Sequence, residues 1–579
     1  MNKKLLSVAI ASALLVTACG SDSDSNNASE PKNVDDTPVV DTPTPVDDSN
    51  DDSSTIDLTK GKSLTRLATI PLGSELTGMY ATDQGDLFFN IQHPSSSLPG
   101  PENKAAVGAW VGVDIQNLDP ELELSSVPAS SAEEAKTTQV ATGSYQAIGR
   151  EGDTFSGGMP FGLGNIVNAD ENMEIKQSND PDFNAFIPTN DDGSEGFLFT
   201  AWEDRPGGMS RIQISKNADG TWNPQAAMNI NFSDVNGTMI NCFGTLSPWG
   251  TPLTSEENYM AELTQQWNEV GASGYPSYAD VQKIQDYLGG TFPNPYDYGY
   301  IVEINQPTAE TPTPEKLFTL GRSAHENPVI MPDNKTVYLT DDGGNKGFYK
   351  FVADTAGDLS AGTLYAAKVV QDSEVTDSST AGFNISWIEL ANANNAQIEQ
   401  WIREYDGIDE SDFVDGQTNY ISDTEVEEWA LGNATDDRVA FLETLRAAGE
   451  KGATVEFNKM EGININYEGL KSGNAPYMYV AMADVNGAMS DSEGDIQITE
   501  NRCGIVYRFN LDTNYNATRM EPVVAGGPYD SNASENRCSI DGIAQPDNIV
   551  VLNDGRVLIG EDSGNHENNM LWVYNPMAN

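Results

Sequence analysis

Val337-Tyr338-Leu339-Thr340-Asp341-Asp342, followed after a short loop by Phe348-Tyr349-Lys350-Phe351-Val352, is the clearest copy of a unit that recurs along the chain. In each copy, a β-rich run ends in polar or acidic residues, and a second β-rich run follows after a loop of variable length. The first runs of the copies are residues 87–93, 197–204, 251–257, 337–342, 478–484 and 557–562. Six such units, many led by turn residues, predict an all-β fold, specifically a six-bladed β-propeller.

The spacing between the units is irregular, which predicts large insertions in a propeller domain spanning 63–579. Helical spacing and good helix formers predict helical inserts near 254–288 and 395–450. Because the ring of a propeller closes on itself, strands from the two ends of the chain can complete one blade.

Acidic residues end the first run in five of the six units. In a propeller, equivalent ends of the inner strands point to one mouth of a central channel. Carboxylates that converge there cannot all stay ionised without cations. The alternative is that each acid merely ends a strand and faces solvent, but the repetition favours a metal site. The residues concerned are Glu203, Glu256 or Glu257, Asp341 or Asp342, Asp484, and Glu561 or Asp562.

Composition points the same way. The chain of 579 residues has 31 Lys and Arg against 88 Asp and Glu, a formal net charge of −57. So acidic a chain does not suit a nucleic-acid phosphate backbone or adsorption to anionic lipid. It does suit divalent or trivalent cations, whose hard ligands are carboxylate oxygens.

The amino-terminal segment 1–19 is typical of a lipoprotein signal peptide. Lys3 and Lys4 precede an apolar stretch, Leu5 to Val16, too short to span a bilayer, and small residues precede Cys19. The alternative is an ordinary signal peptide that contains a Cys. No Asp follows Cys19, so we expect an outer-membrane lipoprotein of a Gram-negative bacterium, on the periplasmic or cell-surface side. Residues 20–62, rich in Ser, Asp, Asn, Thr and Pro, predict a disordered acidic tether.

The cysteines fit an exported protein. If Cys19 carries lipid, Cys503 and Cys538 could form a disulfide in an oxidising compartment. Cys242 then remains as a lone thiol, which is either a small buried hydrophobe or a metal thiolate.

Residues 241–258 read Asn-Cys-Phe-Gly-Thr-Leu-Ser-Pro-Trp-Gly-Thr-Pro-Leu-Thr-Ser-Glu-Glu-Asn. This stretch resembles the Cys, Pro-Trp-Gly-Thr and Glu-Glu-Asn signature of PhoX-type alkaline phosphatases. The resemblance covers about 70 to 575. Further matching stretches are 90–94, 321–326, 337–352, 362–368, 452–462, 546–549 and 560–562.

The resemblance implies a six-bladed propeller whose channel holds Fe3+ and several Ca2+ ions. It implies a phosphoric monoester hydrolase that acts on small phosphate esters outside the cytoplasm, as a monomer that meets the membrane only through its lipid anchor. It assigns Arg322 to holding phosphate and His325 to orienting a ligand or the substrate. The implied metal ligands are Cys242, Glu203, Glu256, Glu257, Glu326, Asp341, Asp342, Glu461, Asp547, Glu561 and Asp562.

The chain departs from the family pattern at basic positions. Ala324 stands where the family often has a basic residue, and Lys459-Met460-Glu461 stands where it has Arg-Pro-Glu. A phosphatase needs cations to hold phosphate. One alternative is therefore a calcium-stabilised propeller that binds a ligand and has lost turnover. Another, by fold analogy alone, is a propeller lactonase or phosphotriesterase with a single calcium ion.

Overall fold

The structure, a computed structural model, describes residues 56–578 apart from residue 157 and the segments 259–263 and 273–276. The predicted signal peptide, Cys19 and most of the predicted tether lie outside the described residues. Among the described residues, no helix has both the length and the apolar character needed to cross a membrane. This part of the chain is mostly β-strand with few helices, so the all-β prediction is confirmed.

Most of the strands form antiparallel sheets in which each strand pairs with the next along the chain. One sheet contains β2 (Glu75–Ala81), β3 (Leu87–Gln92), β4 (Ala106–Val111) and β6 (Ser144–Arg150). The next contains β9 (Pro181–Pro188), β10 (Glu195–Trp202), β11 (Gly208–Lys216) and β12 (Trp222–Asn229). A third contains β13 (Asn241–Leu246), β14 (Pro252–Glu256), β15 (Ile301–Asn305) and β16 (Thr313–Leu317).

A nine-stranded sheet joins two such meanders edge to edge through a pairing of β22 with β27. Its first half is β17 (His325–Ile330), β18 (Thr336–Asp341), β20 (Phe348–Thr355), β21 (Asp358–Gln371) and β22 (Phe383–Asn394). Its second half is β24 (Met460–Asn464), β25 (Tyr477–Met482), β26 (Ile505–Leu511) and β27 (Ala517–Ala525). The repeat copy at 337–352 forms β18 and β20, with Val337 opposite Phe351 and Leu339 opposite Tyr349.

The last sheet combines both ends of the described chain. It contains β28 (Pro546–Val551), β29 (Val557–Glu561), β30 (Met570–Tyr574), β1 (Leu64–Thr69) and β5 (Gln139–Val140). The amino-terminal strand β1 pairs antiparallel with β30, Leu64 lying opposite Tyr574. Two further two-stranded sheets pair β7 (Asn165–Val167) with β8 (Glu174–Gln177), and β19 (Gly344–Lys346) with β23 (Phe457–Asn458).

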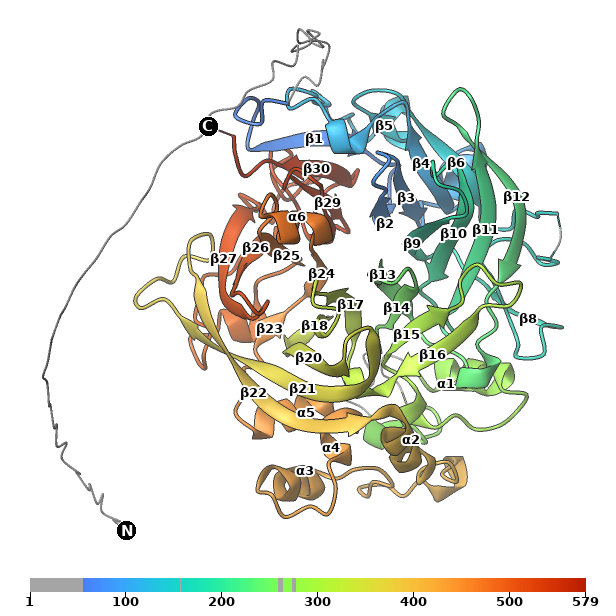
Figure 1. Cartoon of the computed structure of the whole chain (residues 1–579), viewed down its shortest axis with the longest axis vertical. Helices are drawn as coiled ribbons and strands as arrows, with labels where there is room; N and C mark the ends of the chain where they lie inside the picture. Colours follow the sequence, from blue (N-terminus) through green and yellow to red (C-terminus); the bar gives the residue numbers. More distant parts are fainter. Residues whose placement is uncertain (1–55, 157, 259–263, 273–276, 579) are drawn as a thin grey trace, which may run out of the picture. The chain divides into compact units, whose positions relative to one another are not determined.

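The first strands of the meanders lie around a common centre (Figure 1). In chain order, β2, β9, β13, β17, β24 and β28 each contact the next, and β28 contacts β2. We call these the inner strands. Each begins at the same end of the ring, because all the meanders run in the same sense.

Asparagine side chains link neighbouring inner strands. The Asn327 amide exchanges hydrogen bonds with the backbone of Ile463, at 2.7 and 3.0 Å. The Asn184 amide nitrogen donates to the Gly78 carbonyl at 2.9 Å, and the Asn548 amide oxygen accepts the Met79 N–H at 3.2 Å. These bonds satisfy backbone groups where splayed strands cannot pair directly.

The hydrophobic core lies between the faces of adjacent sheets. For example, Phe88 of β3 packs against Phe186 of β9 and Trp222 of β12, with ring centroids 5.5 and 5.3 Å apart. Similar clusters of buried residues separate the other neighbouring sheets. Alternate strand residues therefore face a neighbouring sheet, which is why apolar β-rich runs recur in the sequence.

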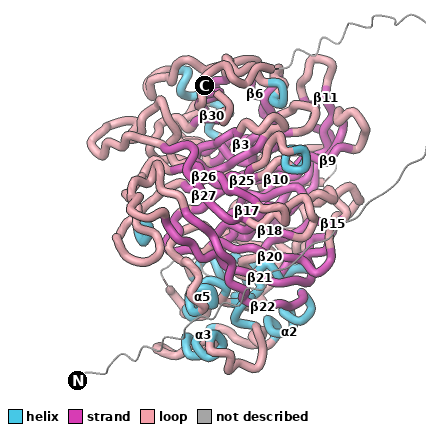
Figure 2. Tube along the Cα trace, turned by 60° about the vertical axis from the view of Figure 1, so that its left-hand side comes forward, coloured by secondary structure: helices cyan, strands magenta, loops and turns pink. Residues whose placement is uncertain are grey.

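The helices of the insert after β22 pack against the β17–β22 half of the nine-stranded sheet and against the β13–β16 sheet. Figure 2 shows α2 (Asn395–Arg403), α3 (Asp423–Ala430) and α5 (Thr444–Glu450) grouped next to β21 and β22. α4 (Arg438–Leu442) belongs to the same insert, whereas α1 (Tyr278–Tyr287) and α6 (Tyr467–Ser472) stand alone. The predicted insert near 254–288 is helical only in its later part, because residues 254–256 continue β14.

Candidate metal centre

Acidic side chains gather at the end of the ring where the inner strands begin. The second strand of each sheet ends at the same place, because it runs antiparallel to the first. We call the following set the acidic cluster: Glu75, Asp182, Cys242, Glu326, Glu461 and Asp547 on the inner strands, and Glu203, Glu257, Asp342 and Asp562 directly after β10, β14, β18 and β29.

Irregular pairing exposes these side chains to the centre. Asp182 is an extra residue between the pairs Trp202–Pro181 and Ala201–Phe183, so β9 bulges there. Glu326, Glu461 and Asp547 lie inside comparable register shifts on β17, β24 and β28. A bulge re-aims a side chain and is common next to functional sites.

The structure separates Glu256 from Glu257. Glu256 is fully buried, and its two carboxylate oxygens accept hydrogen bonds from the backbone N–H groups of Met239, Gly299 and Tyr300. The Lys316 ammonium adds an ion pair at 3.1 Å. Glu256, which was expected to be a metal ligand, thus has both carboxylate oxygens bonded to the protein, and Glu257 is the member of the acidic cluster.

Asp341 and Glu561 repeat this arrangement. Asp341 accepts hydrogen bonds from the Ala324 N–H at 3.1 Å and the Tyr349 hydroxyl at 3.1 Å. Glu561 accepts from the Trp572 indole at 2.7 Å and from the His566 ring at 2.9 Å, as well as from backbone N–H groups. Asp341 and Glu561, both expected to be ligands, therefore bond to the protein itself, and the following residues, Asp342 and Asp562, belong to the cluster.

Three overlapping groups in the acidic cluster have metal-ligand spacing. Within each group, one ligand atom per residue lies within 4.8 Å of the others. Cys242 belongs to two of these groups and Glu326 also to two, so the groups form a continuous site. The groups are Asp182 with Cys242 and Glu326, Glu203 with Cys242 and Glu257, and Glu326 with Glu461 and Asp547.

The cluster carries strong mutual repulsion. Burial, followed by the charges of neighbouring carboxylates, raises the pKa of Asp182, Glu257, Glu326 and Asp547 well above the ordinary range. Burial and the Asp180 charge raise the pKa of Glu203 to about 7. Carboxylates placed like this need protons or cations to coexist.

The thiol of Cys242 lies among carboxylates. Its Sγ is 2.8 Å from Asp182 Oδ2 and 3.0 Å from Glu326 Oε2, so these two oxygens are the hydrogen-bond acceptors of its single S–H. Burial and the neighbouring charges raise the pKa of this thiol. A buried thiol held between acids is unlike a cysteine that merely fills an apolar core.

Some carboxylate oxygens of the cluster have no hydrogen-bond donor beside them in the described part of the chain. Asp182 Oδ1 and Glu326 Oε1 are buried and have no hydrogen-bond partner among the residues that the structure describes. An unpaired buried carboxylate oxygen is costly unless a cation meets it. The donor set of carboxylate oxygens with one sulfur therefore fits metal ions.

Sequence reasoning missed Glu75, Asp182 and Lys459. Lys459 Nζ lies 2.6 Å from Asp342 Oδ2 and 3.1 Å from Glu461 Oε1, with 38% of the side chain exposed. Asp182 directly precedes a β-rich run, and Glu326 and Asp547 stand shortly before one. An acidic residue in front of a β-rich run was therefore the sequence signal that could have identified Asp182. Asp484, expected to join the cluster, accepts a hydrogen bond from Asn486 at 2.8 Å.

Arg322 does not reach the cluster. Its fully buried guanidinium donates to the Tyr298 and Leu442 carbonyls and to the Thr264 hydroxyl, and it lies over the Tyr296 ring. Arg322, expected to hold phosphate, therefore contacts the insert and the segment before the β15 strand in this structure.

His325 is likewise structural in its contacts. Its Nε2 is 2.9 Å from the Gly321 carbonyl and its Nδ1 is 3.2 Å from the Ser323 hydroxyl. Burial lowers the pKa of His325 to about 4. The ring is thus neutral and faces its own loop, and the expectation that it orients a ligand or substrate is not supported by these contacts.

The remaining cysteines are paired. Cys503 and Cys538 form a disulfide that spans 35 residues of the chain. Cys242 is the free cysteine among the described residues. The predicted lipid attachment at Cys19 lies outside the part of the chain that the structure describes.

The chain matches one protein family and resembles solved structures. The family model described as Alkaline phosphatase PhoX matches residues 202–576. The chain is similar to the solved structure of Pseudomonas fluorescens PhoX in complex with vanadate, a transition state analogue. That similarity has a TM-score of 0.51 and 16% identity, and covers 89% of this chain and 88% of the other.

A more distant likeness is to a crystal structure of glucose dehydrogenase, with a TM-score of 0.38 and 8% identity over 88% of this chain and 98% of the other. No curated protein matches the chain. At these identities, the similarity to solved structures concerns the fold alone.

Proposed function

Because the chain belongs to the PhoX alkaline phosphatase family, we propose that it is a metal-dependent phosphomonoesterase that acts outside the cytoplasm. The observation that carries the proposal is the acidic cluster. It collects carboxylates and a thiol from every sheet of the ring at one end of the inner strands. We also propose that the ring is a six-bladed propeller, which the closed succession of contacts between the inner strands supports.

The acidic cluster suits two kinds of cation. Carboxylate oxygens such as those of Glu461 and Asp547 suit Ca2+, a hard ion that takes several oxygen ligands. The thiol of Cys242 beside Asp182, Glu203 and Glu257 suits Fe3+, because a thiolate combined with carboxylates favours a transition metal. When bound, such cations would neutralise a phosphoryl group and polarise its oxygen atoms.

We assign the binding of the phosphate group to Lys459 in place of Arg322. Its ammonium is already bonded to Asp342 and Glu461, so it lies at the edge of the cluster, and it is partly exposed. The residue replaces the Arg of the family's Arg-Pro-Glu segment. An ammonium supplies a positive charge to a phosphoryl oxygen, but it lacks the planar fork of arginine.

Other side chains hold the cluster in place. The Gln92 amide donates to Glu203 at 3.0 Å, and the Asn548 amide donates to Asp547 at 3.2 Å. The corrected residues Glu256, Asp341 and Glu561 fix the backbone one residue before each cluster acid. Positioned ligands of this kind reduce the reorganisation needed when substrate binds.

For the location, we propose an outer-membrane lipoprotein attached through Cys19. The support is the amino-terminal motif in the sequence, together with a disulfide that suits an oxidising compartment.

The test uses the full chain purified with CaCl2 and an iron(III) salt. Bound metals are quantified by elemental mass spectrometry, and hydrolysis of p-nitrophenyl phosphate is followed with and without EDTA. Glu257→Gln is compared with Glu389→Gln, whose carboxylate is exposed on β22. We expect bound calcium and iron, turnover that EDTA removes, and loss of turnover in Glu257→Gln only.

Two outcomes would contradict the proposal. Bound metals without turnover on several phosphomonoesters would favour the second candidate, a calcium-stabilised binding protein. The observation behind it is Ala324, which stands where the family often has a basic residue. Turnover that survives the removal of all metal would exclude the metal centre as the catalytic site.

A further inference from the structure

The ring carries a second site at its opposite end. A cavity of about 340 Å³ lies where the inner strands end. This volume is at the lower end of the ~300–1,000 Å³ typical of small-molecule pockets. Its walls come from the ends of β2, β13, β24 and β28 and from α6. We call it the far pocket.

The far pocket is separate from the acidic cluster. Along β2, Glu75 belongs to the cluster and Tyr80 lines the far pocket. Five residues of strand separate them, which is roughly 15 Å at about 3.3 Å per residue. Asn184, which lines the pocket, donates to Asn90 of β3 at 2.8 Å and accepts from Thr200 of β10 at 2.7 Å, and no residue of the acidic cluster lines the pocket.

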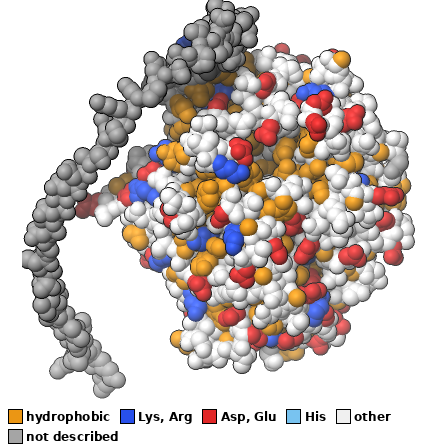
Figure 3. Space-filling view, viewed as in Figure 1, with side chains coloured by type: hydrophobic (Ala, Val, Ile, Leu, Met, Phe, Trp, Pro, Cys, Tyr) orange, Lys and Arg blue, Asp and Glu red, His pale blue; other side chains and the backbone are white. Residues whose placement is uncertain are grey.

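The floor of the far pocket is apolar. It is lined by Met79, Phe183, Phe243, Ile465 and Val550. Figure 3 shows apolar side chains gathered near the middle of the face in view, with acidic side chains distributed over the rest. A ligand that fills the pocket must therefore present an apolar part to it.

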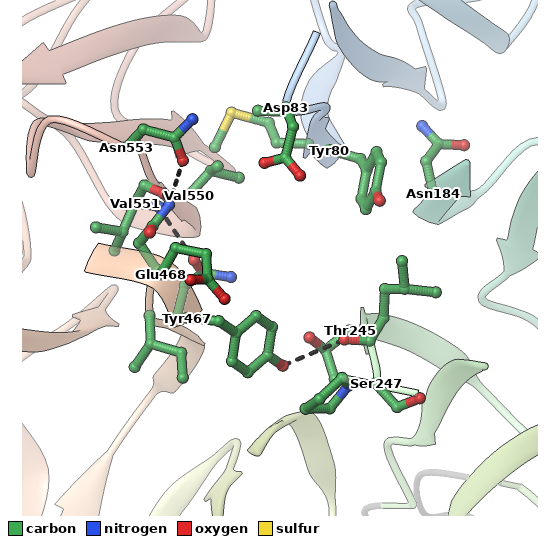
Figure 4. Close-up of a pocket in the computed structure, with 18 of the residues that line it drawn as sticks. Tyr80, Asp83, Asn184, Thr245, Ser247, Tyr467, Glu468, Val550, Val551 and Asn553 are labelled. Carbon is green, nitrogen blue, oxygen red and sulfur yellow. Dashed lines mark hydrogen bonds between the residues drawn. The ribbon is translucent and has the colours of Figure 1, made fainter. Parts of the chain in front are cut away.

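The rim of the far pocket offers hydrogen-bond acceptors and aromatic rings. Figure 4 shows the carboxylates of Asp83 and Glu468 directed toward the central space, with the rings of Tyr80 and Tyr467 beside it. The Tyr467 hydroxyl is occupied, because it donates to the Leu246 carbonyl at 3.2 Å. Both tyrosines thus contribute ring surface to the pocket.

The amide oxygens around the rim already accept hydrogen bonds from the protein. Asn466 donates to Asn553 at 2.8 Å and accepts from the Gly469 N–H at 2.6 Å. The Asn464 amide oxygen accepts the Val551 N–H at 3.0 Å. The amide oxygens of Asn464, Asn466 and Asn553 are therefore occupied, and the charged acceptors of the pocket are the carboxylates of Asp83 and Glu468. Lys471 also lines the pocket, but its ammonium is bonded to Glu468 at 3.0 Å, which leaves the pocket with a net negative charge.

We propose that the far pocket binds a small organic ammonium compound with an apolar or aromatic portion. The ammonium group meets the Asp83 carboxylate and the faces of Tyr80 and Tyr467, while the apolar portion lies on the floor. A cation over a tyrosine ring is attracted by the ring's negative face, and more strongly when water is excluded. The net charge of −57 raises the local concentration of any such cation.

The same lining rejects other classes of ligand. A phosphate ester or carboxylate would face Asp83 and Glu468 without a free cation to pair with them. A sugar would turn hydroxyl groups toward the apolar floor and leave them without hydrogen-bond partners. The far pocket is therefore not a second substrate site of the proposed phosphatase, and the inference does not depend on that function.

Three probes of matched size separate these classes. They are phenethylamine, 2-phenylethanol and phenylacetate, which share one ring and differ in charge. Isothermal titration calorimetry on the full chain, with glucose as the sugar probe, gives each affinity. We expect phenethylamine to bind saturably, 2-phenylethanol to bind about tenfold or more weakly, and phenylacetate and glucose not to bind measurably.

Substitutions locate the site. Asp83→Asn removes the charge while it keeps the shape, and we expect it to weaken phenethylamine binding about tenfold. Asp170→Asn, another exposed carboxylate elsewhere on the surface, is the matched control and leaves binding unchanged. Ala81→Trp, at the end of β2, fills the cavity and should abolish binding. Circular dichroism spectra and thermal midpoints establish that each variant is folded.

The results that overturn the proposal are distinct. Equal affinities for phenethylamine and 2-phenylethanol would show that charge has no part in recognition. Glucose binding that Ala81→Trp abolishes would make the far pocket a sugar site. Phenethylamine binding that survives both Asp83→Asn and Ala81→Trp would place the amine elsewhere on the acidic surface.

Discussion

Glu256 and Glu257 are neighbours in the chain, but their carboxylates have different surroundings. The Glu256 carboxylate accepts hydrogen bonds from the protein itself and pairs with Lys316, whereas the Glu257 carboxylate lies beside Glu203 and Cys242 in the acidic cluster. Consecutive strand residues point to opposite sides, so the first acid faces its own sheet and the second faces the centre.

Substitution of Glu256 should therefore affect stability, whereas substitution of Glu257 should affect metal binding. Glu256→Gln leaves the Lys316 charge buried without its partner, which we expect to lower the free energy of unfolding by about 3–5 kcal/mol. Glu257→Gln should cost little stability in the absence of metal but should lower metal affinity more than ~100-fold. Urea unfolding and calcium titration of both variants check this, and equal loss of stability in both would contradict it.

Cys242 is expected to decide which metal binds. Cys242→Ser keeps the size of the side chain but replaces a soft sulfur by oxygen. We expect bound iron to fall at least about tenfold while bound calcium is retained, because iron gains most from a thiolate among these ligands. Elemental analysis and the visible absorption spectrum of the purified variant measure this. Unchanged iron content in Cys242→Ser would remove the thiol from the site.

Lys459 is expected to act on the substrate. Lys459→Met removes a charge that can bond to a phosphoryl oxygen, and we expect kcat/KM for p-nitrophenyl phosphate to fall by roughly 10–100-fold. Lys459→Arg should retain most of the activity, since arginine also binds phosphate. Metal content, measured in saturating calcium, should stay the same in both variants. Loss of activity together with metal would instead make Lys459 a support for the cluster.

Acid should destabilise the fold through His325. Burial holds the pKa of His325 at about 4, against an ordinary value of 6.5, so the unfolded chain binds the proton more tightly than the native chain. Stability from the neutral ring is complete above pH 6.5 and is lost as pH falls toward 4, by roughly 2 kcal/mol at pH 5. Urea unfolding of the wild type and His325→Asn at pH 7.5 and 5, in saturating calcium, isolates this part. An equal pH response in the two proteins would contradict it.

The disulfide should add stability mainly by restricting the unfolded chain. Cys503 and Cys538 are 35 positions apart in the chain, for which loop-closure entropy gives about 3–4 kcal/mol. We expect the double variant Cys503→Ala, Cys538→Ala to lose that much free energy of unfolding. Dithiothreitol should lower the unfolding midpoint of the wild type but not that of the double variant. A wild type unaffected after complete reduction would contradict this.

The sequence alone predicted the all-β class because each repeat copy is a pair of buried strands. Those copies correspond to the second and third strands of the sheets, such as β18 with β20 and β29 with β30. The inner strands escaped notice because they are bulged and mix acids with apolar residues, which breaks the alternating pattern. Glu75 and Asp182 lie on those strands, so they were missed.

The choice within each acidic pair could not be made from the sequence. Glu256, Asp341 and Glu561 differ from the residues after them only in which backbone N–H groups lie opposite, and those groups come from distant segments. Arg322 was misplaced for the same reason, since its partners Tyr298 and Leu442 belong to other elements. A motif supplies the residue types, and long-range contacts decide the direction in which each side chain points.

The pairing of β1 with β30 has a consequence for biosynthesis. Leu64 is among the first of the described residues to be synthesised, and its partner Tyr574 is among the last. The ring therefore cannot close on a nascent chain, and the acidic cluster, which draws on residues from Glu75 to Asp562, is assembled only after the whole chain has been synthesised. A premature stop that removes only β30 would therefore also leave the amino-terminal strand β1 without its partner.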